Sequence, residues 1–361
     1  FPDFEPPKGL LDALQARLSQ GGYHQYPPMH GIADLRCQIA EKVRRHYRVT
    51  VDPELDITVT SGATEALFVA MQAVVQPHDE VILFDPAYDA YDPAVRLAGG
   101  IPVHLALKAP HFTIDLALLR AAITPKTRLL VINSPHNPCG SLIDAETLKA
   151  IGQLATEFGL YVLSDEVYEH MVFDDARHIS ALEIPDLKDR SFVVSSFGKT
   201  YHATGWKVAY CIAPEALTRE FRKVHQFVTF TTHTPSQWAI ADFMASDQGH
   251  VENLSAFYQD KRDRFLRLFD GLGFRMRPSP GTYFQLADYS GVAALAHLPD
   301  TDCAVALTKN YGVAAIPVSV FYDAPPKSSR VLRFCFAKSD ETLIEAARRL
   351  ALGLGSTGTA P

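Results

Sequence analysis

The chain has 361 residues, of which 47% are hydrophobic and 21% charged, and its formal net charge at pH 7 is -7. This is the composition of a globular protein with a sizeable core, divided into two or three packed units or one large and one smaller domain. The acidic balance, without a long run of one sign, argues against a nucleic-acid partner. Apolar runs stay below the roughly 18 residues of a membrane span, so we expect no membrane partner.

The five cysteines, at positions 37, 139, 211, 303 and 335, are odd in number and widely spaced. This predicts reduced thiols in a cytoplasmic protein rather than disulfides or a zinc site. The fourteen histidines show no His-Glu-x-x-His spacing, so we expect no metal. The chain begins with Phe1-Pro-Asp-Phe rather than Met, and we expect the N-terminal arm to be incomplete.

Apolar, β-branched runs alternate with helical patterns through the first half of the chain. The expected strands are 56–60, 81–85, 102–107, 128–133, 161–165 and 191–196. The amphipathic stretches that predict helices between them include 65–75, 115–122 and 144–158. Continuously apolar strands are typical of a parallel sheet buried on both faces. We therefore expect a doubly wound α/β core, whose ligands bind beyond the carboxyl ends of the strands.

The pattern changes beyond about residue 215. A long helical region, from 215 to about 267, precedes short strands and helices that extend to about residue 354. We interpret this part of the chain as a second, α+β unit.

A lysine, Lys199, follows the last expected strand in the segment Ser195-Ser-Phe-Gly-Lys-Thr-Tyr-His-Ala-Thr-Gly-Trp-Lys-Val-Ala209. Most lysines at such positions are solvated strand ends. Here the preceding run is apolar and rich in small residues, so we expect Lys199 to emerge at a buried strand end. A desolvated amine can act as a nucleophile, which is what Schiff-base chemistry needs.

This segment resembles the lysine signature of class I/II aminotransferases that depend on pyridoxal 5'-phosphate (PLP). The resemblance extends from Phe1-Pro-Asp-Phe4 to Arg333-Phe-Cys-Phe-Ala-Lys338 and is nearest to the branch of bacterial methionine aminotransferases and kynurenine (glutamine) aminotransferases. It implies an α/β, PLP-dependent transferase fold of the aspartate-aminotransferase type. The large domain, with a mainly parallel seven-stranded sheet between helices, would cover residues 13–248. The smaller α+β domain would cover residues 1–12 and 249–361.

The resemblance implies three catalytic residues and a fourth beside them. Lys199 would carry the cofactor, Asp165 would pair with its pyridine nitrogen, and Tyr168 would donate to its phenolic oxygen. Asn137 would bind the same oxygen and lie near the substrate carboxylate. The family usually has threonine where Cys139 stands. Read without the family, Asp165 is also a candidate helix N-cap and Asn137 a candidate turn residue.

A second set of residues would hold the cofactor's phosphate and ring. The segment Ser61-Gly-Ala-Thr-Glu65 opens a helix, where backbone N–H groups and the helix dipole favour an anion. By resemblance, Ala63, Thr64, Ser196 and Lys207 form the phosphate cup. Most relatives of the aspartate type have arginine where Lys207 stands, so the charge is kept without the bidentate fork. Tyr88 matches the aromatic residue that stacks on the pyridine ring.

The remaining matches concern the substrate and the subunit partner. Arg333 matches the arginine that holds the substrate α-carboxylate; a buried arginine needs such a partner, whereas Arg330 reads as a solvated strand entry. Tyr26 matches a tyrosine that reaches the cofactor phosphate of the neighbouring subunit and lies near the substrate, and Phe230 would also approach the pocket. The resemblance thus implies a homodimer with composite active sites.

The function expected from these matches is ping-pong transfer of an amino group to a 2-oxo acid. The donors would be apolar, aromatic or sulfur-containing L-amino acids: methionine, phenylalanine, tyrosine, glutamine or kynurenine. One alternative is a cysteine-S-conjugate β-lyase that uses the same lysine and cofactor. The other is a non-catalytic, aminotransferase-like sensor domain.

Overall fold

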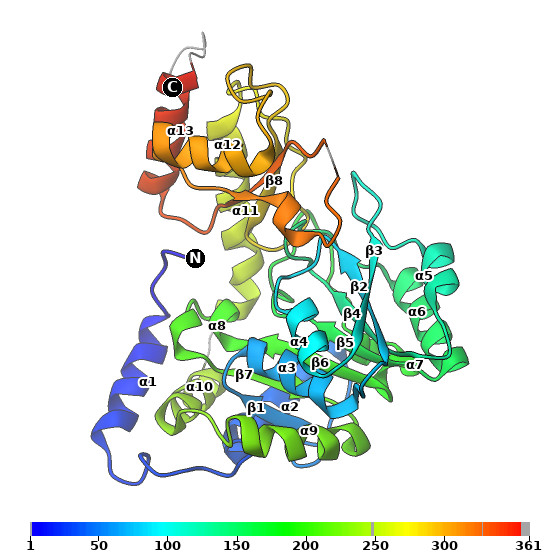
Figure 1. Ribbon diagram of the computed structural model, residues 1–361. Coiled ribbons are helices and arrows are strands. Elements are labelled where there is room, and N and C mark those ends of the chain that lie inside the picture. The colour runs from blue at the N-terminus through cyan, green and yellow to red at the C-terminus, as the bar shows by residue number, and fades with distance from the viewer. Residues whose placement is uncertain (1, 247–248, 327, 355–361) are drawn as a thin grey trace.

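The computed structural model describes residues 2–246, 249–326 and 328–354. A large sheet with helices on both faces lies below a smaller sheet with its own helices, and the long helix α11 (His250–Phe269) runs between the two (Figure 1). In the part of the chain that the structure describes, we find no helix both long and apolar enough to cross a membrane.

The large sheet contains seven strands in the order β1-β7-β6-β5-β4-β2-β3. Their bounds are β1 (Ile57–Thr60), β2 (Glu80–Asp85), β3 (Ile101–Ala106), β4 (Thr127–Asn133), β5 (Tyr161–Asp165), β6 (Ser191–Ser196) and β7 (Ala209–Ile212). β7 pairs antiparallel with β1 and β6, whereas the other neighbouring pairs are parallel. The expected mainly parallel, seven-stranded sheet is therefore confirmed.

Both faces of this sheet are buried, because successive strand residues enter different hydrophobic clusters. In β4, Leu129 and Val131 join the cluster that contains residues of α3 (Ala63–Val74) and α4 (Tyr91–Leu97). Leu130 and Ile132 join the cluster of α2 (Ala33–Tyr47) and α6 (Ala145–Phe158). Burial on both sides explains why the strands read as uninterrupted apolar runs.

Aspartate side chains set the start of two expected helices. Asp115 accepts hydrogen bonds from the backbone of α5 (Leu116–Ala122), and Asp144 does the same for α6. Each residue is an N-cap, so each helix begins one position later than expected. The remaining helices beside the large sheet are α1 (Lys8–Ser19), α7 (Pro185–Lys188), α8 (Phe197–Thr200), α9 (Glu215–Val228) and α10 (Thr234–Ser246).

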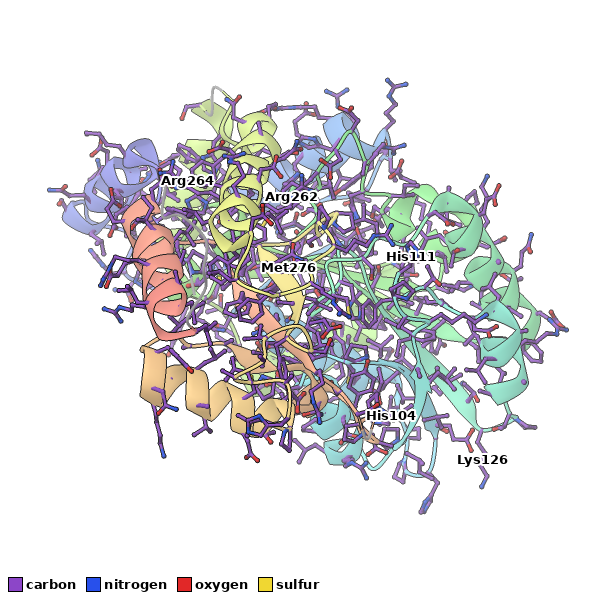
Figure 2. All side chains as sticks on the ribbon, turned by 90° about the horizontal axis from the view of Figure 1, so that it is seen from above. His104, His111, Lys126, Arg262, Arg264 and Met276 are labelled. Carbon is purple, nitrogen blue, oxygen red and sulfur yellow. The ribbon has the colours of Figure 1, made fainter. Side chains whose placement is uncertain are left out.

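The smaller sheet has the order β8-β10-β9, all antiparallel, with bounds β8 (Phe284–Asp288), β9 (Ile316–Pro317) and β10 (Val331–Cys335). It packs with α11, α12 (Asp300–Ala306) and α13 (Asp340–Leu354), which form the upper part of Figure 1. Arg262 of α11, labelled in Figure 2, pairs with Asp174 from the loop after β5. This buried arginine thus ties α11 to the large sheet.

One expectation about the second half of the chain was wrong. The region 215–267 is helical as expected and contains three helices, but α9 packs on α3 while α10 packs on α1 and α2. The change of pattern at 215 therefore does not mark the end of the large unit. The interruption coincides with Thr229–Thr232, where β-branched residues disfavour helix and Phe230 has a φ of 68°.

Candidate active site

A cavity of about 490 Å³ opens at the carboxyl edge of the large sheet. Its walls include residues that follow or end five of the strands, namely Thr64, Tyr88, Asn137, Asp165 and Lys199. Parallel strands place their carboxyl ends at one edge, so segments far apart in sequence meet there. The structure thus brings together the expected residues of the large sheet.

Lys199 lies in the short helix α8, directly after β6, and is half-buried. Its Nζ donates a hydrogen bond to the hydroxyl of Tyr283 across 3.0 Å. It also lies 5.5 Å from the centre of the Tyr168 ring. The preceding Gly198 allows this close packing, because a Cβ there would lie only 3.0 Å from Cα of Thr204.

Asp165 ends β5 and is 4% exposed. Its Oδ2 accepts a hydrogen bond from the hydroxyl of Tyr91 across 2.6 Å, and its Oδ1 accepts one from the backbone of Val167 across 3.3 Å. Burial raises the pKa of the Asp165 carboxyl to about 6, although the Tyr91 bond opposes this shift. A buried carboxylate whose hydrogen-bond donors are neutral favours a cationic ligand, such as a protonated pyridine nitrogen.

Asn137 and Arg333 meet at the rim of the cavity. The side-chain oxygen of Asn137 accepts a hydrogen bond from Arg333. The backbone N–H of Asn137 donates to the side-chain oxygen of Asn133. The Arg333 guanidinium lies 4.0 Å from the centre of the Phe284 ring, and burial lowers its pKa. Among the described residues, no carboxylate forms an ion pair with Arg333, which leaves its charge available for a carboxylate ligand.

The far end of the cavity fits a phosphate. Gly62 precedes α3 with a φ of +82°, and no side chain caps the helix, so the first backbone N–H groups face the space beside Ala63 and Thr64. A Cβ on Gly62 would lie 2.9 Å from Nζ of Lys207. The glycine therefore lets this ammonium reach the helix start. Ser196 lines the same cavity. These donors suit a doubly charged anion.

Tyr88 lies between the phosphate end and Asp165. Its hydroxyl is hydrogen-bonded to Thr64, its pKa is raised by burial, and its ring packs edge-on against Tyr91 with centroids 5.5 Å apart. Tyr168 is buried on the other side, with its ring perpendicular to that of Tyr283. Burial also raises the pKa of Tyr168. Tyr88 and Tyr168 both line the cavity, and aromatic walls suit a flat heterocycle.

Three expected residues do not line this cavity in the single chain: Arg333, which contacts the lining residues Asn137 and Phe284, and Tyr26 and Phe230. Tyr26 is 84% exposed, and its ring packs edge-on against Phe230 at 5.4 Å between centroids. The neighbouring Thr232 accepts a hydrogen bond from Ser61, which precedes the phosphate end. Tyr26 and Phe230 therefore form a surface next to the cavity rather than part of its wall.

Sequence reasoning missed two residues of the site, Tyr91 and Tyr283. Tyr91 closes the segment Asp85-Pro-Ala-Tyr-Asp-Ala-Tyr91 and holds the Asp165 carboxylate. Tyr283 precedes the buried Phe284 at the start of β8 and holds Lys199. An aromatic pair after the Pro/Gly cluster 278–281 was the available signal for Tyr283.

One group of residues has ligand atoms close enough for a metal. The atoms of Asp92, His104 and Asp323 all lie within 4.8 Å of one another. However, His104 already contacts Asp92 and the buried Asp85 through its two ring nitrogens, and Arg96 donates to both oxygens of Asp92. These ion pairs explain the cluster without a metal.

The fold and the cavity define a class of α/β proteins in which a lysine, a buried carboxylate and the start of a helix meet at the carboxyl edge of the large sheet. The family model described as "Aminotransferase class I and II" matches residues 1–350, and the chain belongs to this family. Members of the family use PLP, and the residues of the cavity suit it: an amine, a carboxylate, flanking aromatic rings and an anion-binding helix start.

Three relatives illustrate the range of the family. The chain is 45% identical to a methionine aminotransferase of Escherichia coli (strain K12) over 97% of its length and 89% of that protein. It is 34% identical to a kynurenine–oxoglutarate transaminase of Dictyostelium discoideum, over 96% and 87%. The solved N-succinyldiaminopimelate aminotransferase of Mycobacterium tuberculosis is 40% identical, with a TM-score of 0.93, over 98% and 91%. The expected aspartate-aminotransferase type of fold is confirmed by these matches.

Proposed function

We propose that this chain is an aminotransferase that moves the amino group of an apolar, aromatic or sulfur-containing L-amino acid to a 2-oxo acid, with PLP held on Lys199. The observation that carries the proposal is one cavity with Lys199 and Asp165 in its walls and an anion-binding helix start at its end. PLP, when bound, supplies an electron sink that makes the substrate α-proton acidic.

Each wall of the cavity has its own task. Asp165 would hold the ring nitrogen and keep it protonated, while Tyr168 and Asn137 would donate to the phenolic oxygen. Tyr88 would flank the ring. The amine of Lys199 would take the α-proton of the substrate at Nζ. At the other end, Ser196, Lys207 and the backbone N–H groups of Ala63 and Thr64 bind the phosphate.

Arg333 orients the amino acid by binding its α-carboxylate. Two parallel N–H donors match two carboxylate oxygens, which fixes the position of the α-carbon as well as binding the charge. Asn137 already contacts Arg333 and lies in the cavity wall. A carboxylate beside these two residues would hold the α-proton within reach of Lys199, which is the orientation that proton transfer needs.

The preference for an uncharged side chain rests on the cations of the cavity. Among the described residues, the side chains that line it include only two cations, Lys199 and Lys207. The first anchors the cofactor and the second binds its phosphate, so neither remains for a side-chain carboxylate. The names of the Escherichia coli and Dictyostelium relatives agree with methionine, kynurenine and similar donors.

We also propose a homodimer with composite active sites. Phe227, Val228 and Phe230 are exposed apolar residues close together in sequence. The exposed Tyr26 contacts Phe230. Exposed apolar groups of this kind mark interaction surfaces. A second copy seated on this surface would receive Tyr26 at its phosphate end and Phe230 at its substrate pocket, which neither residue reaches in its own chain.

Two organisational proposals accompany this function. We propose a large domain of residues 13–248 and a small domain of residues 1–12 and 249–361; in the described part, α10 packs on the large unit and β8 to β10 form their own sheet. We also propose a cytoplasmic protein, which five free cysteines favour.

The direct test of the function is a panel of donors against one 2-oxo acid. We expect methionine, phenylalanine or tyrosine to exceed aspartate in kcat/KM, and a best rate with aspartate would contradict the proposed pocket. N-succinyldiaminopimelate belongs in the panel because one relative is named for it. A cysteine S-conjugate that releases its thiol faster than it is transaminated would favour the β-lyase alternative.

A further inference from the structure

Tyr283 is buried within the cavity wall, with 2% of its surface exposed. Its hydroxyl accepts a hydrogen bond of 3.0 Å from Nζ of Lys199. Among the described residues, Nζ makes no other hydrogen bond. The same hydroxyl is also bonded to Tyr168. The amine of Lys199 is therefore held by a neutral oxygen between two aromatic rings, 5.5 and 5.6 Å from their centres.

The backbone fixes the position of Tyr283. Thr282, which is fully buried, has a φ of 64°, a conformation that is costly for a β-branched residue. Its backbone N–H donates to Met171, and its hydroxyl accepts from Phe284. The carbonyl of Tyr283 accepts from Phe336. A strained backbone conformation persists only where surrounding contacts hold it. The contacts of Thr282 and Tyr283 fix the backbone that carries the Tyr283 ring.

Lys199 has a competing partner in the same cavity. The charge of Lys199 acts on the Asp165 carboxylate, whose hydrogen bonds come from neutral donors. An amine drawn into an ion pair with Asp165 would stay protonated and could not take a proton. It would also occupy the carboxylate that the cofactor ring nitrogen needs. The neutral hydroxyl of Tyr283 holds the amine without stabilising its charge to the same degree.

We propose that Tyr283 is a positioning residue for Lys199: it holds the released amine beside the substrate α-carbon and away from Asp165. This inference rests on the proposed function, since it concerns the same lysine. It assigns to Tyr283 a task in proton transfer rather than in cofactor binding. Loss of its hydroxyl should therefore slow one step and leave the cofactor bound.

The test is Tyr283→Phe, which removes the hydroxyl and keeps the ring packed against Tyr168 and Phe284. A matched control is Tyr258→Phe. Tyr258 is an equally buried neighbour, with ring centroids 5.9 Å apart, and its hydroxyl has no hydrogen-bond partner among the described residues. Both variants lose one buried hydroxyl, but only one of these groups contacts Lys199. Single-turnover reaction with α-protonated and α-deuterated methionine gives the rate of the proton-transfer step.

We expect Tyr283→Phe to react roughly 2- to 13-fold more slowly, from about 0.5–1.5 kcal/mol for a hydrogen bond between neutral groups. The deuterium isotope effect on the reaction of Tyr283→Phe should rise. The dissociation constant of PLP should stay within about threefold of the wild-type value. Tyr258→Phe should behave as wild type. An unchanged rate and isotope effect in Tyr283→Phe would overturn the proposal, as would equal losses in both variants.

Borohydride labelling separates this inference from the function on which it rests. If Lys199 is labelled in wild type and in Tyr283→Phe, the proposed function stands whatever the kinetics show, and the rates alone decide the role of Tyr283. If wild type carries the cofactor on another residue, the proposed function and this inference both fail.

Discussion

Arg333 donates a hydrogen bond to the side-chain oxygen of Asn137 across 2.6 Å, although 196 positions separate the two residues. The contact joins β10 of the small sheet to the loop after β4 of the large one. It places the two groups assigned to the substrate carboxylate side by side before any substrate arrives. Preorganised donors of this kind contribute more to binding than donors that must be ordered on binding.

We predict that Arg333→Lys lowers kcat/KM roughly 10- to 150-fold, because a lysine loses the bidentate geometry and about 1.5–3 kcal/mol with it. PLP binding should be almost unchanged. Arg330→Lys is the control, since Arg330 donates to the carbonyls of Ala296 and Ser329 and is hydrogen-bonded to Tyr289 rather than to Asn137. Steady-state kinetics with methionine check the prediction, and equal effects of the two variants would remove Arg333 from the substrate site.

Asp165 gives a prediction about the stability of the cofactor-free protein. Its pKa is raised to about 6, mainly by burial, whereas the unfolded value is about 3.9. The folded state then binds more protons between these values, so stability falls as the pH rises from about 4 to 6 and stays lower above. Asp165→Asn should therefore stabilise the apoprotein at pH 8 by about 1–3 kcal/mol, and by little at pH 4.

Denaturant unfolding at the two pH values measures this difference. In the presence of PLP the same variant should bind the cofactor partly and lose most of its turnover, since a neutral amide no longer keeps the ring nitrogen protonated. If Asp165→Asn is less stable than wild type at pH 8, the charged Asp165 carboxylate is stabilised without a cationic ligand. A half-reaction rate within about twofold of wild type would remove it from the mechanism.

His104, labelled in Figure 2, lies between Asp85 and Asp92, and its hydrogen bond to Asp85 raises its pKa to about 9. Since the ordinary histidine pKa is about 6.5, its stabilising effect is complete below that value and is lost as the pH rises to about 9. Asp85 also accepts a hydrogen bond from the backbone of Asp323, which follows β9 of the small sheet. This hydrogen bond connects the His104 cluster to the segment after the small sheet's β9.

We predict that wild type loses stability between pH 6.5 and 9 by on the order of 1–3 kcal/mol, and that His104→Gln removes this dependence. His111→Gln is the control, because His111 is an exposed residue that contacts Arg277 instead of a carboxylate (Figure 2). Thermal unfolding across this pH range checks the prediction. If the stability of His104→Gln falls with pH as steeply as that of wild type, the prediction is wrong.

The composite site predicts that two damaged subunits restore each other. Tyr26→Phe should weaken PLP binding roughly 10- to 150-fold, and Lys199→Ala should be inactive. In a mixed dimer, one site carries both defects and the other carries neither. Activity at limiting PLP should rise toward half the wild-type value for each mixed dimer. Subunit exchange shown by mass, without recovered activity, would mean that Tyr26 serves its own subunit.

The sequence predicted the residues whose signals are local. Lys199, Asp165 and Asn137 each stand at or shortly after the end of an apolar strand within a short motif, so their arrival at one sheet edge follows from the parallel order alone. Tyr91 and Tyr283 were not predicted, because their partners lie 74 and 84 positions away and depend on which elements become neighbours in space.

The fold shows the same division between local and distant signals. The six strands and three helices that were named lie within one or two residues of their observed bounds, because burial on both faces leaves long apolar runs, whereas α1, α2 and α4 were not named. β7 was not located, because no long amphipathic helix separates it from β6, so the alternation of strand and helix that marks the other strands is missing there. The boundary at 215 was wrong because amphipathic helices look alike in sequence whichever sheet they cover, and only packing assigns α9 and α10 to the large unit.

Borohydride reduction followed by peptide mass spectrometry shows which residue carries the cofactor. We expect one added phosphopyridoxyl group on the peptide that contains Lys199, and none on that peptide in Lys199→Ala. Lys207→Ala, at saturating PLP, should still be labelled at Lys199, because Lys207 would bind only the phosphate. Label on Lys207 or any other lysine in wild type, or undiminished label in Lys199→Ala, would show that Lys199 does not carry the cofactor.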